Sequence, residues 1–187
     1  MASVVSPGAT LDDLARVEGK AELVGGRIVY LMPTGDLPTD VALNVTVSLR
    51  SYSKQVGRGV AKGDGIGYGI PELASGRESF SPDASWYDGP RPANRMRFIE
   101  GPPTFAAEVR SENDYGKAAE EELAEKRADY FAAGTLVVWD VDPIAECVRV
   151  YRADDPTQPT TYRRGEVAEA EPAVPGWRLP VNEIFSE

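Results

Sequence analysis

The chain contains no histidine and a single cysteine, Cys147. One cysteine cannot form an internal disulfide, and without histidine the chain cannot build a His- or Cys-ligated zinc site. The same absence excludes Ser-His-Asp and Cys-His catalysis. Any chemistry must therefore rest on carboxylates, lysine, hydroxyl groups, or a hard metal ion bound by oxygen atoms.

Long hydrophobic runs are also missing. No stretch approaches the roughly 20 consecutive apolar residues of a membrane helix, and the start, MASVVSPGATLDD, lacks the basic segment and apolar core of a signal peptide. We therefore expect a cytoplasmic protein with no membrane partner. The 187 residues suffice to bury one core but are few for two, so residues 1–187 are predicted to form a single domain.

Acidic residues exceed basic ones, and the formal net charge is -10. This balance argues against a general nucleic-acid binder, because affinity for phosphate backbones comes largely from Lys and Arg. The acid is mostly C-terminal: residues 1–110 carry 12 basic and 13 acidic side chains, and residues 111–187 carry 8 and 17. Both a localised basic face and scattered solvated charge stay open for two basic runs, Arg50, Lys54, Arg58 and Lys62, and Arg91, Arg95 and Arg97.

Local patterns predict both helices and strands. Helical spacing, capping residues and a C-terminal glycine predict helices after the N-cap Thr10, at about 40–55, from Gly116 to Ala133 with Gly134 as C-cap, and near Val181. Apolar runs and turn signals predict strands at 21–24, 27–31, 81–86, 104–109, 135–141 and 146–152, with further short strands between 57 and 76. Gly25-Gly26 joins the first two strands into an N-terminal β-hairpin.

The order strand, helix, strand over residues 104–141 indicates a crossover between parallel strands, and the flanking hairpins indicate antiparallel additions to the same sheet. The predicted fold class is therefore α/β: one domain with a mixed, twisted sheet flanked by helices.

Two carboxylates occur where apolar residues are expected. Glu108 lies in the apolar run FAAEV, where burial of an ionised carboxylate would cost several kcal/mol without a partner. Asp83 lies between Pro82 and the apolar start of its own strand. Each residue either points outward from an edge strand or requires a cation.

Lys126 is out of place in a similar way. A rotation of 100° per residue places it in the middle of an apolar stripe that comprises Ala119, Leu123, Lys126, Tyr130 and Ala133. An i, i+4 pair with Glu122 and a side chain that snorkels to water would explain it. The helix follows the Glu108 strand in a crossover, however, so Lys126 could instead approach Glu108.

Carboxylates from neighbouring strands can hold Mg2+, and a lysine beside them can position an attacking water and offset charge on a phosphodiester. Arg110, two residues after Glu108 and on the same strand face, is a poor base but a good phosphate clamp. This combination is typical of a metal-dependent nuclease.

The sequence resembles the Uma-two type restriction endonucleases of the PD-(D/E)XK nuclease superfamily. The resemblance runs from about residue 10 to the end and rests on the order and spacing of ELVGGRIV (22–29), MPTG (32–35), SPD (81–83), EVRS (108–111), Lys126 to Tyr130, Gly134 and VWDVDP (138–143). It implies a restriction-endonuclease-like fold and Mg2+- or Mn2+-dependent hydrolysis of DNA phosphodiester bonds.

The resemblance also assigns roles to residues. Asp83 and Glu108 would be the metal-binding carboxylates, and Glu22 an additional acidic residue from the N-terminal hairpin or its adjoining helix. The superfamily's usual lysine two residues after the second acid is absent, because Arg110 stands there. Lys126 on the following helix matches a displaced catalytic lysine, and Arg110 would contact phosphate.

Two other functions remain open at this stage. The net charge and the missing lysine favour a non-catalytic nuclease-fold interaction module of a defence or mobile-element system. A metal-dependent phosphoesterase acting on a small substrate would also tolerate an acidic surface. A homodimer is expected by analogy, because two sites related by a two-fold axis can cut both strands of a duplex.

Overall fold

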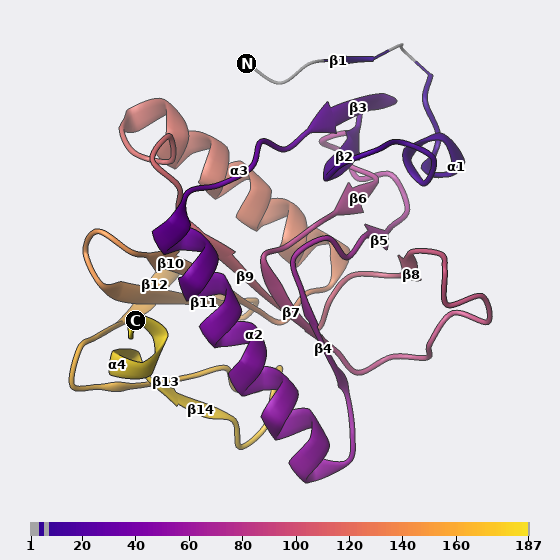
Figure 1. Cartoon of the computed structure of the whole chain (residues 1–187). Coiled ribbons are helices and arrows are strands. Elements are labelled where there is room, and N and C mark those ends of the chain that lie inside the picture. The colour runs from indigo at the N-terminus through magenta and orange to yellow at the C-terminus, as the bar shows by residue number, and fades with distance from the viewer. Residues whose placement is uncertain (1–3, 6–7, 187) are drawn as a thin grey trace.

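The computed structural model describes residues 4–5 and 8–186, and its centre is a six-stranded sheet (Figure 1). The strand order is β12-β11-β10-β9-β7-β4. From one edge to the other, these strands are β12 (Asp155–Arg163), β11 (Cys147–Arg152), β10 (Val137–Asp142), β9 (Phe105–Val109), β7 (Ala84–Tyr87) and β4 (Val60–Gly63).

Strands β9 and β10 run parallel, and α3 (Lys117–Ala133) connects them. In their register Glu108 lies opposite Asp140. The other pairs in this sheet are antiparallel. The sheet is therefore mixed, with the crossover at the position that the sequence predicts.

Helix α2 (Asp36–Val56) covers one face of the sheet with Val41, Val45 and Leu49. It is predicted to begin near residue 40 but begins at Asp36, because Pro38 falls in the first turn, where a helix tolerates proline. The C-terminal elements β13 (Val167–Glu169), β14 (Arg178–Pro180) and α4 (Val181–Ile184) pack against the same core.

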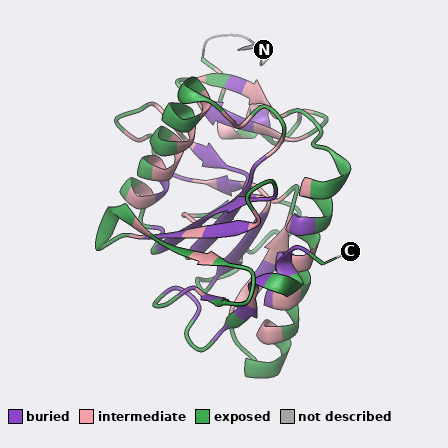
Figure 2. Ribbon diagram, turned by 90° about the vertical axis from the view of Figure 1, so that its left-hand side faces the viewer, coloured by how far each residue is buried: buried purple, intermediate pink, exposed green. Residues whose placement is uncertain are grey.

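Helix α3 covers the opposite face, and Figure 2 shows the buried strands between the two long helices. Tyr130 of α3 is fully buried and stacks on Phe80 with ring centroids 4.0 Å apart. The predicted inward stripe is confirmed, because Ala119, Leu123, Lys126, Tyr130 and Ala133 are all buried or half-buried. Gly134 ends the helix in the left-handed conformation, as expected.

Two small sheets complete the fold on the α3 side and at the N-terminus. The first contains β6 (Ser79–Phe80), β5 (Tyr68–Gly69) and β8 (Ile99–Glu100). The second contains β1 (Val4–Val5), β3 (Arg27–Tyr30) and β2 (Ala21–Val24), with the predicted hairpin at Gly25-Gly26. The capping box at Thr10 starts α1 (Leu11–Leu14) as predicted. Within the described residues, no helix has both the length and the apolar character needed to cross a membrane.

The turn between α2 and β4 supplies a test of the packing. Gly57 and Gly59 both have positive φ, 68° and 64°, but only Gly59 lies against a side chain, since an added Cβ would come within 2.0 Å of the Trp86 ring. We predict that Gly57→Ala lowers the free energy of unfolding by about 1–2 kcal/mol, for backbone strain alone. Gly59→Ala should cost about 1–3 kcal/mol more, because it also overpacks the core.

Urea denaturation of the two variants measures this difference. Equal losses of stability would contradict the predicted clash with Trp86.

Candidate active site

Strand β9 brings Glu108 to the face of the sheet that α3 covers. Its alternate residues Phe105, Ala107 and Val109 belong to the core beneath α2. Glu108 accepts hydrogen bonds from Lys126 Nζ at 3.0 Å and from the Tyr130 hydroxyl at 2.5 Å. The predicted approach of Lys126 to Glu108 is therefore confirmed.

Lys126 lies between two carboxylates and does not snorkel to water. Its ammonium is 3.0 Å from Glu108 and 3.1 Å from Glu22, and only 18% of its side chain is exposed. Burial alone would lower the pKa of Lys126, but the two carboxylates outweigh burial and raise it. The lysine therefore keeps its proton and its positive charge.

Glu22, from β2, closes the other side of this group. It is 3% exposed, its Oε2 lies 2.5 Å from Arg77 Nη1, and its Oε1 accepts the backbone N–H of Ser81 at 2.9 Å. Burial would raise its pKa, but Lys126 and Arg77 together lower it to about 2. Glu22 consequently holds Lys126 from the side opposite Glu108.

Asp83 immediately precedes β7 and is fixed beside Glu108 by the backbone of β9. Its Oδ2 accepts the N–H of Val109 at 2.9 Å, and its Oδ1 accepts a hydrogen bond from Lys20 Nζ at 2.8 Å. Lys20 also pairs with Asp64 at 2.6 Å.

Lys20 is a site residue that the sequence analysis missed. A signal for it exists, since Lys20 stands two residues before Glu22 and side chains two apart share one face of an extended chain.

A cleft of about 620 Å³ joins these groups. It lies between α2 and α3, across the end of β9. Lys20, Asp83, Glu108 and Lys126 all line it. Arg110 lines the cleft as well, so the structure brings four of the predicted site residues, Asp83, Glu108, Lys126 and Arg110, to one cleft. Glu22 contacts Lys126 from behind.

Neighbouring carboxylates repel Glu108 within the cleft. Burial raises the pKa of Glu108, and repulsion from Asp83 and Glu22 raises it further, although Lys126 opposes both effects. A divalent cation between Asp83 and Glu108 would relieve that repulsion.

The donor set also suits a hard metal ion. Mg2+ is commonly bound by one or two carboxylates, with water and substrate phosphate completing its coordination. Asp83 and Glu108 supply such a pair, and each carboxylate oxygen can accept more than one partner. Among residues 4–5 and 8–186, no group of three or more acidic side chains is arranged to hold a metal. Asp83 and Glu108 are thus the residues that could hold a magnesium ion, whose remaining ligands would be water.

Arg110 has other partners than the phosphate that the sequence analysis predicted. Its Nε and Nη2 each donate to Asp140 at 2.6 Å, and both of its Nη atoms contact Glu120. Its side chain is only 3% exposed. Arg110 therefore ties β9 to β10 and to the start of α3.

This arrangement predicts a structural penalty for losing the Arg110 charge. Arg110→Met should lower the free energy of unfolding by on the order of 3 kcal/mol, because it removes both short hydrogen bonds to the buried Asp140 and leaves that carboxylate only the longer contact with Arg149, at 3.7 Å. Lys117→Met removes an exposed pair with Glu121 and should cost less than about 0.5 kcal/mol. Urea denaturation of both variants measures the difference, and similarly small losses would refute the structural role.

The lowered pKa of Glu22 predicts a specific pH dependence. Ionised Glu22 stabilises the folded state above its unfolded pKa of about 4.5, and this contribution is lost as the pH falls toward 2. Glu22→Gln should therefore reduce the free energy of unfolding at pH 7 by on the order of 3 kcal/mol, and the difference from wild type should shrink between pH 4.5 and 2.

Urea titrations at several pH values measure this shrinking difference. Glu125→Gln, on the exposed outer face of α3, should stay within about 0.5 kcal/mol of wild type throughout. A Glu22→Gln penalty that is constant with pH would show that the interaction is not ionic.

Comparisons with known proteins agree with this fold. A crystal structure described as a "putative nuclease belonging to DUF820" from Anabaena variabilis aligns with a TM-score of 0.71 and 20% identity, covering 94% of this chain and 97% of that one. No curated protein matches the chain. The family model of Uma2, described as "Putative restriction endonuclease", matches residues 9–182. Because this match spans nearly the whole sequence, the chain belongs to the Uma2 family.

Proposed function

We propose that this protein is an endonuclease that hydrolyses DNA phosphodiester bonds with the help of Mg2+ or Mn2+. The observation that carries the proposal is the convergence of Asp83, Glu108 and Lys126 in one cleft, from three elements distant in sequence. Membership of a family described as restriction endonucleases supports it.

In this proposal Asp83 and Glu108 hold the metal ion. When bound, such an ion polarises the phosphodiester and makes its bound water a stronger acid. Val109 N–H keeps the Asp83 carboxylate in place, and the Tyr130 hydroxyl does the same for Glu108. The two carboxylates are thus oriented before any ligand arrives.

Lys126 acts as a fixed positive charge. Because Glu108 and Glu22 raise its pKa, it keeps its proton near neutral pH, so it orients the attacking water and stabilises negative charge on the phosphate rather than removing a proton. Glu22 is a positioning residue that acts through Lys126. In the reaction the attacking water gives up one proton as its oxygen bonds to phosphorus, one phosphorus–oxygen ester bond breaks, and the leaving oxygen takes up one proton, so that water is consumed and no net proton is released from these bonds.

Lys20 and Arg110 both line the cleft, and the phosphate contact predicted for Arg110 remains a prediction. The Lys20 ammonium, at the cleft wall beside Asp83, is in position to contact a phosphate oxygen, whereas the Arg110 guanidinium is held by Asp140 and Glu120. We therefore assign a phosphate contact to Lys20 as well.

One observation favours a non-catalytic nuclease-fold module as the second candidate. Both oxygens of Asp83 and both oxygens of Glu108 already have a proton donor or ammonium partner. A metal must therefore share these oxygens with Lys20 and Lys126 or displace them. The homodimer expected by analogy, from the need to cut both strands of a duplex, remains a prediction.

Plasmid cleavage tests the proposal. With Mg2+ or Mn2+, wild-type protein should nick or linearise plasmid, whereas Asp83→Asn, Glu108→Gln and Lys126→Met should each lose at least about 100-fold in rate. Glu125→Gln changes the net charge as Glu108→Gln does, but on the exposed face of α3, and should retain wild-type activity.

Two further measurements separate the alternatives. Calorimetric titration with Mn2+ should show binding that Asp83→Asn and Glu108→Gln weaken, and its absence would favour the non-catalytic module. Cleavage of a chromogenic phosphodiester without cleavage of plasmid would instead indicate a small substrate. Equal nicking by all variants would indicate a contaminant and overturn the assignment.

A further inference from the structure

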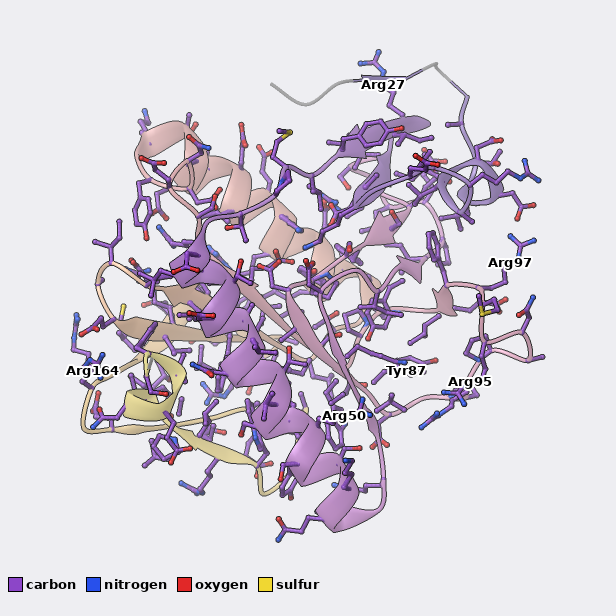
Figure 3. All side chains as sticks on the ribbon, in the orientation of Figure 1. Arg27, Arg50, Tyr87, Arg95, Arg97 and Arg164 are labelled. Atoms are coloured by element: carbon purple, nitrogen blue, oxygen red, sulfur yellow. The ribbon has the colours of Figure 1, made fainter. Side chains whose placement is uncertain are left out.

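The fold brings together parts of the two basic runs, which the candidate active site does not use. Lys62 of β4 and Arg91, Arg95 and Arg97 of the β7–β8 loop line one shallow depression of about 50 Å³. Arg50 of α2 adds its charge to the same region. Figure 3 shows Arg50, Arg95 and Arg97 on the side of the molecule where β4 ends the main sheet.

The local structure explains how residues 29 or more positions apart meet. Lys62 lies opposite Ser85 in the β4–β7 ladder. After Tyr87 the chain leaves β7 and returns past the edge strand β4 to β8. This return places Arg91 and Arg95 over Lys62, and Tyr87 lines the same depression.

Four of these cations have no acidic counterpart. Arg97 pairs with Asp12 at 3.2 Å, but among the described residues no carboxylate lies within ion-pair distance of Arg50, Lys62, Arg91 or Arg95. Burial lowers the pKa of Lys62, and the three arginines lower it further. We call Arg50, Lys62, Arg91 and Arg95 the edge cluster.

An uncompensated positive cluster is notable on a chain of net charge -10. Like charges held together repel, and a bound anion would relieve that repulsion.

The edge cluster adjoins the cleft. Gly63 and Asp64, which directly follow Lys62, line the cleft, and Thr46, one helical turn before Arg50, also lines it. A ligand that occupies the cleft and continues along β4 therefore meets the edge cluster next.

We propose that the edge cluster binds the phosphate backbone of a DNA substrate whose scissile phosphate occupies the cleft. The inference rests on the proposed nuclease function and extends it by naming the surface that receives the flanking nucleotides. A polyanion fits better than a single phosphate, because the four charges come from a helix, a strand and a loop, and three of them are exposed. Backbone contacts of this kind position the duplex without reading its sequence.

Salt-dependent DNA binding tests the proposal without any cleavage step. Fluorescence anisotropy of a labelled duplex, with metal-free protein, should show at least tenfold weaker binding by Arg91→Gln/Arg95→Gln than by wild type at about 50 mM salt. The slope of log affinity against log salt should fall by about 2, one for each lost phosphate contact. Arg27→Gln/Arg164→Gln changes the net charge equally at two exposed positions that Figure 3 shows away from Arg50 and Arg95, and it should bind as wild type does.

Three outcomes would overturn the inference. The first is equal binding of the duplex by the two double variants, and the second is no binding of the duplex by wild type at low salt. The third is that Arg91→Gln/Arg95→Gln loses binding to anionic lipid vesicles but binds DNA as wild type does. A cluster that only protects the edge strand from pairing with other chains would give the first outcome.

Hydrolysis of a chromogenic phosphodiester keeps the two proposals separate. Arg91→Gln/Arg95→Gln should hydrolyse this small substrate as well as wild type does, because the cleft is intact. If wild type hydrolyses nothing but binds DNA through the edge cluster, the nuclease proposal fails and the DNA surface stands. If hydrolysis is metal-dependent and DNA binding ignores the cluster, the surface fails and the nuclease stands.

Discussion

The placement of one ammonium group between two buried carboxylates organises this structure. Lys126 of α3 contacts Glu108 of the central sheet and Glu22 of the N-terminal hairpin, so it joins three segments that are distant in sequence. Without that charge, both carboxylates would be buried near each other, at a cost of several kcal/mol. The polar cleft is stable because its charges compensate one another, and the same charges make it suited to phosphate chemistry.

The crossover from β9 through α3 to β10 places these paired charges at the cleft between α2 and α3. Glu108 projects beneath α3, whereas Val109, the next residue, belongs to the core under α2 and uses its backbone N–H to hold Asp83. Arg110, which follows Val109, binds Asp140 of β10 and Glu120 of α3. Consecutive residues of one strand thus supply a carboxylate, an anchor for a second carboxylate, and a structural ion pair.

Much of the fold follows from local patterns, and so does part of the site. The lysine in the apolar stripe of α3 and the acid in the apolar strand β9 are each costly unless paired, and the crossover predicts that they meet. Arg110 shows where such reasoning stops. Its strand face was predicted correctly, but its partners Asp140 and Glu120 come from the next strand and helix, and no spacing in the sequence identifies them.

The sequence by itself determined the order of elements, the two faces of α3 and the exclusion of histidine and thiol chemistry, because these depend on residue type and local periodicity. Only the tertiary structure decided that Lys20 contacts Asp83, that Arg110 is held inside, and that Arg50 and Lys62 lie with Arg91 and Arg95. Those contacts join segments tens of residues apart, and such segments become neighbours only through strand pairing and packing of the whole domain.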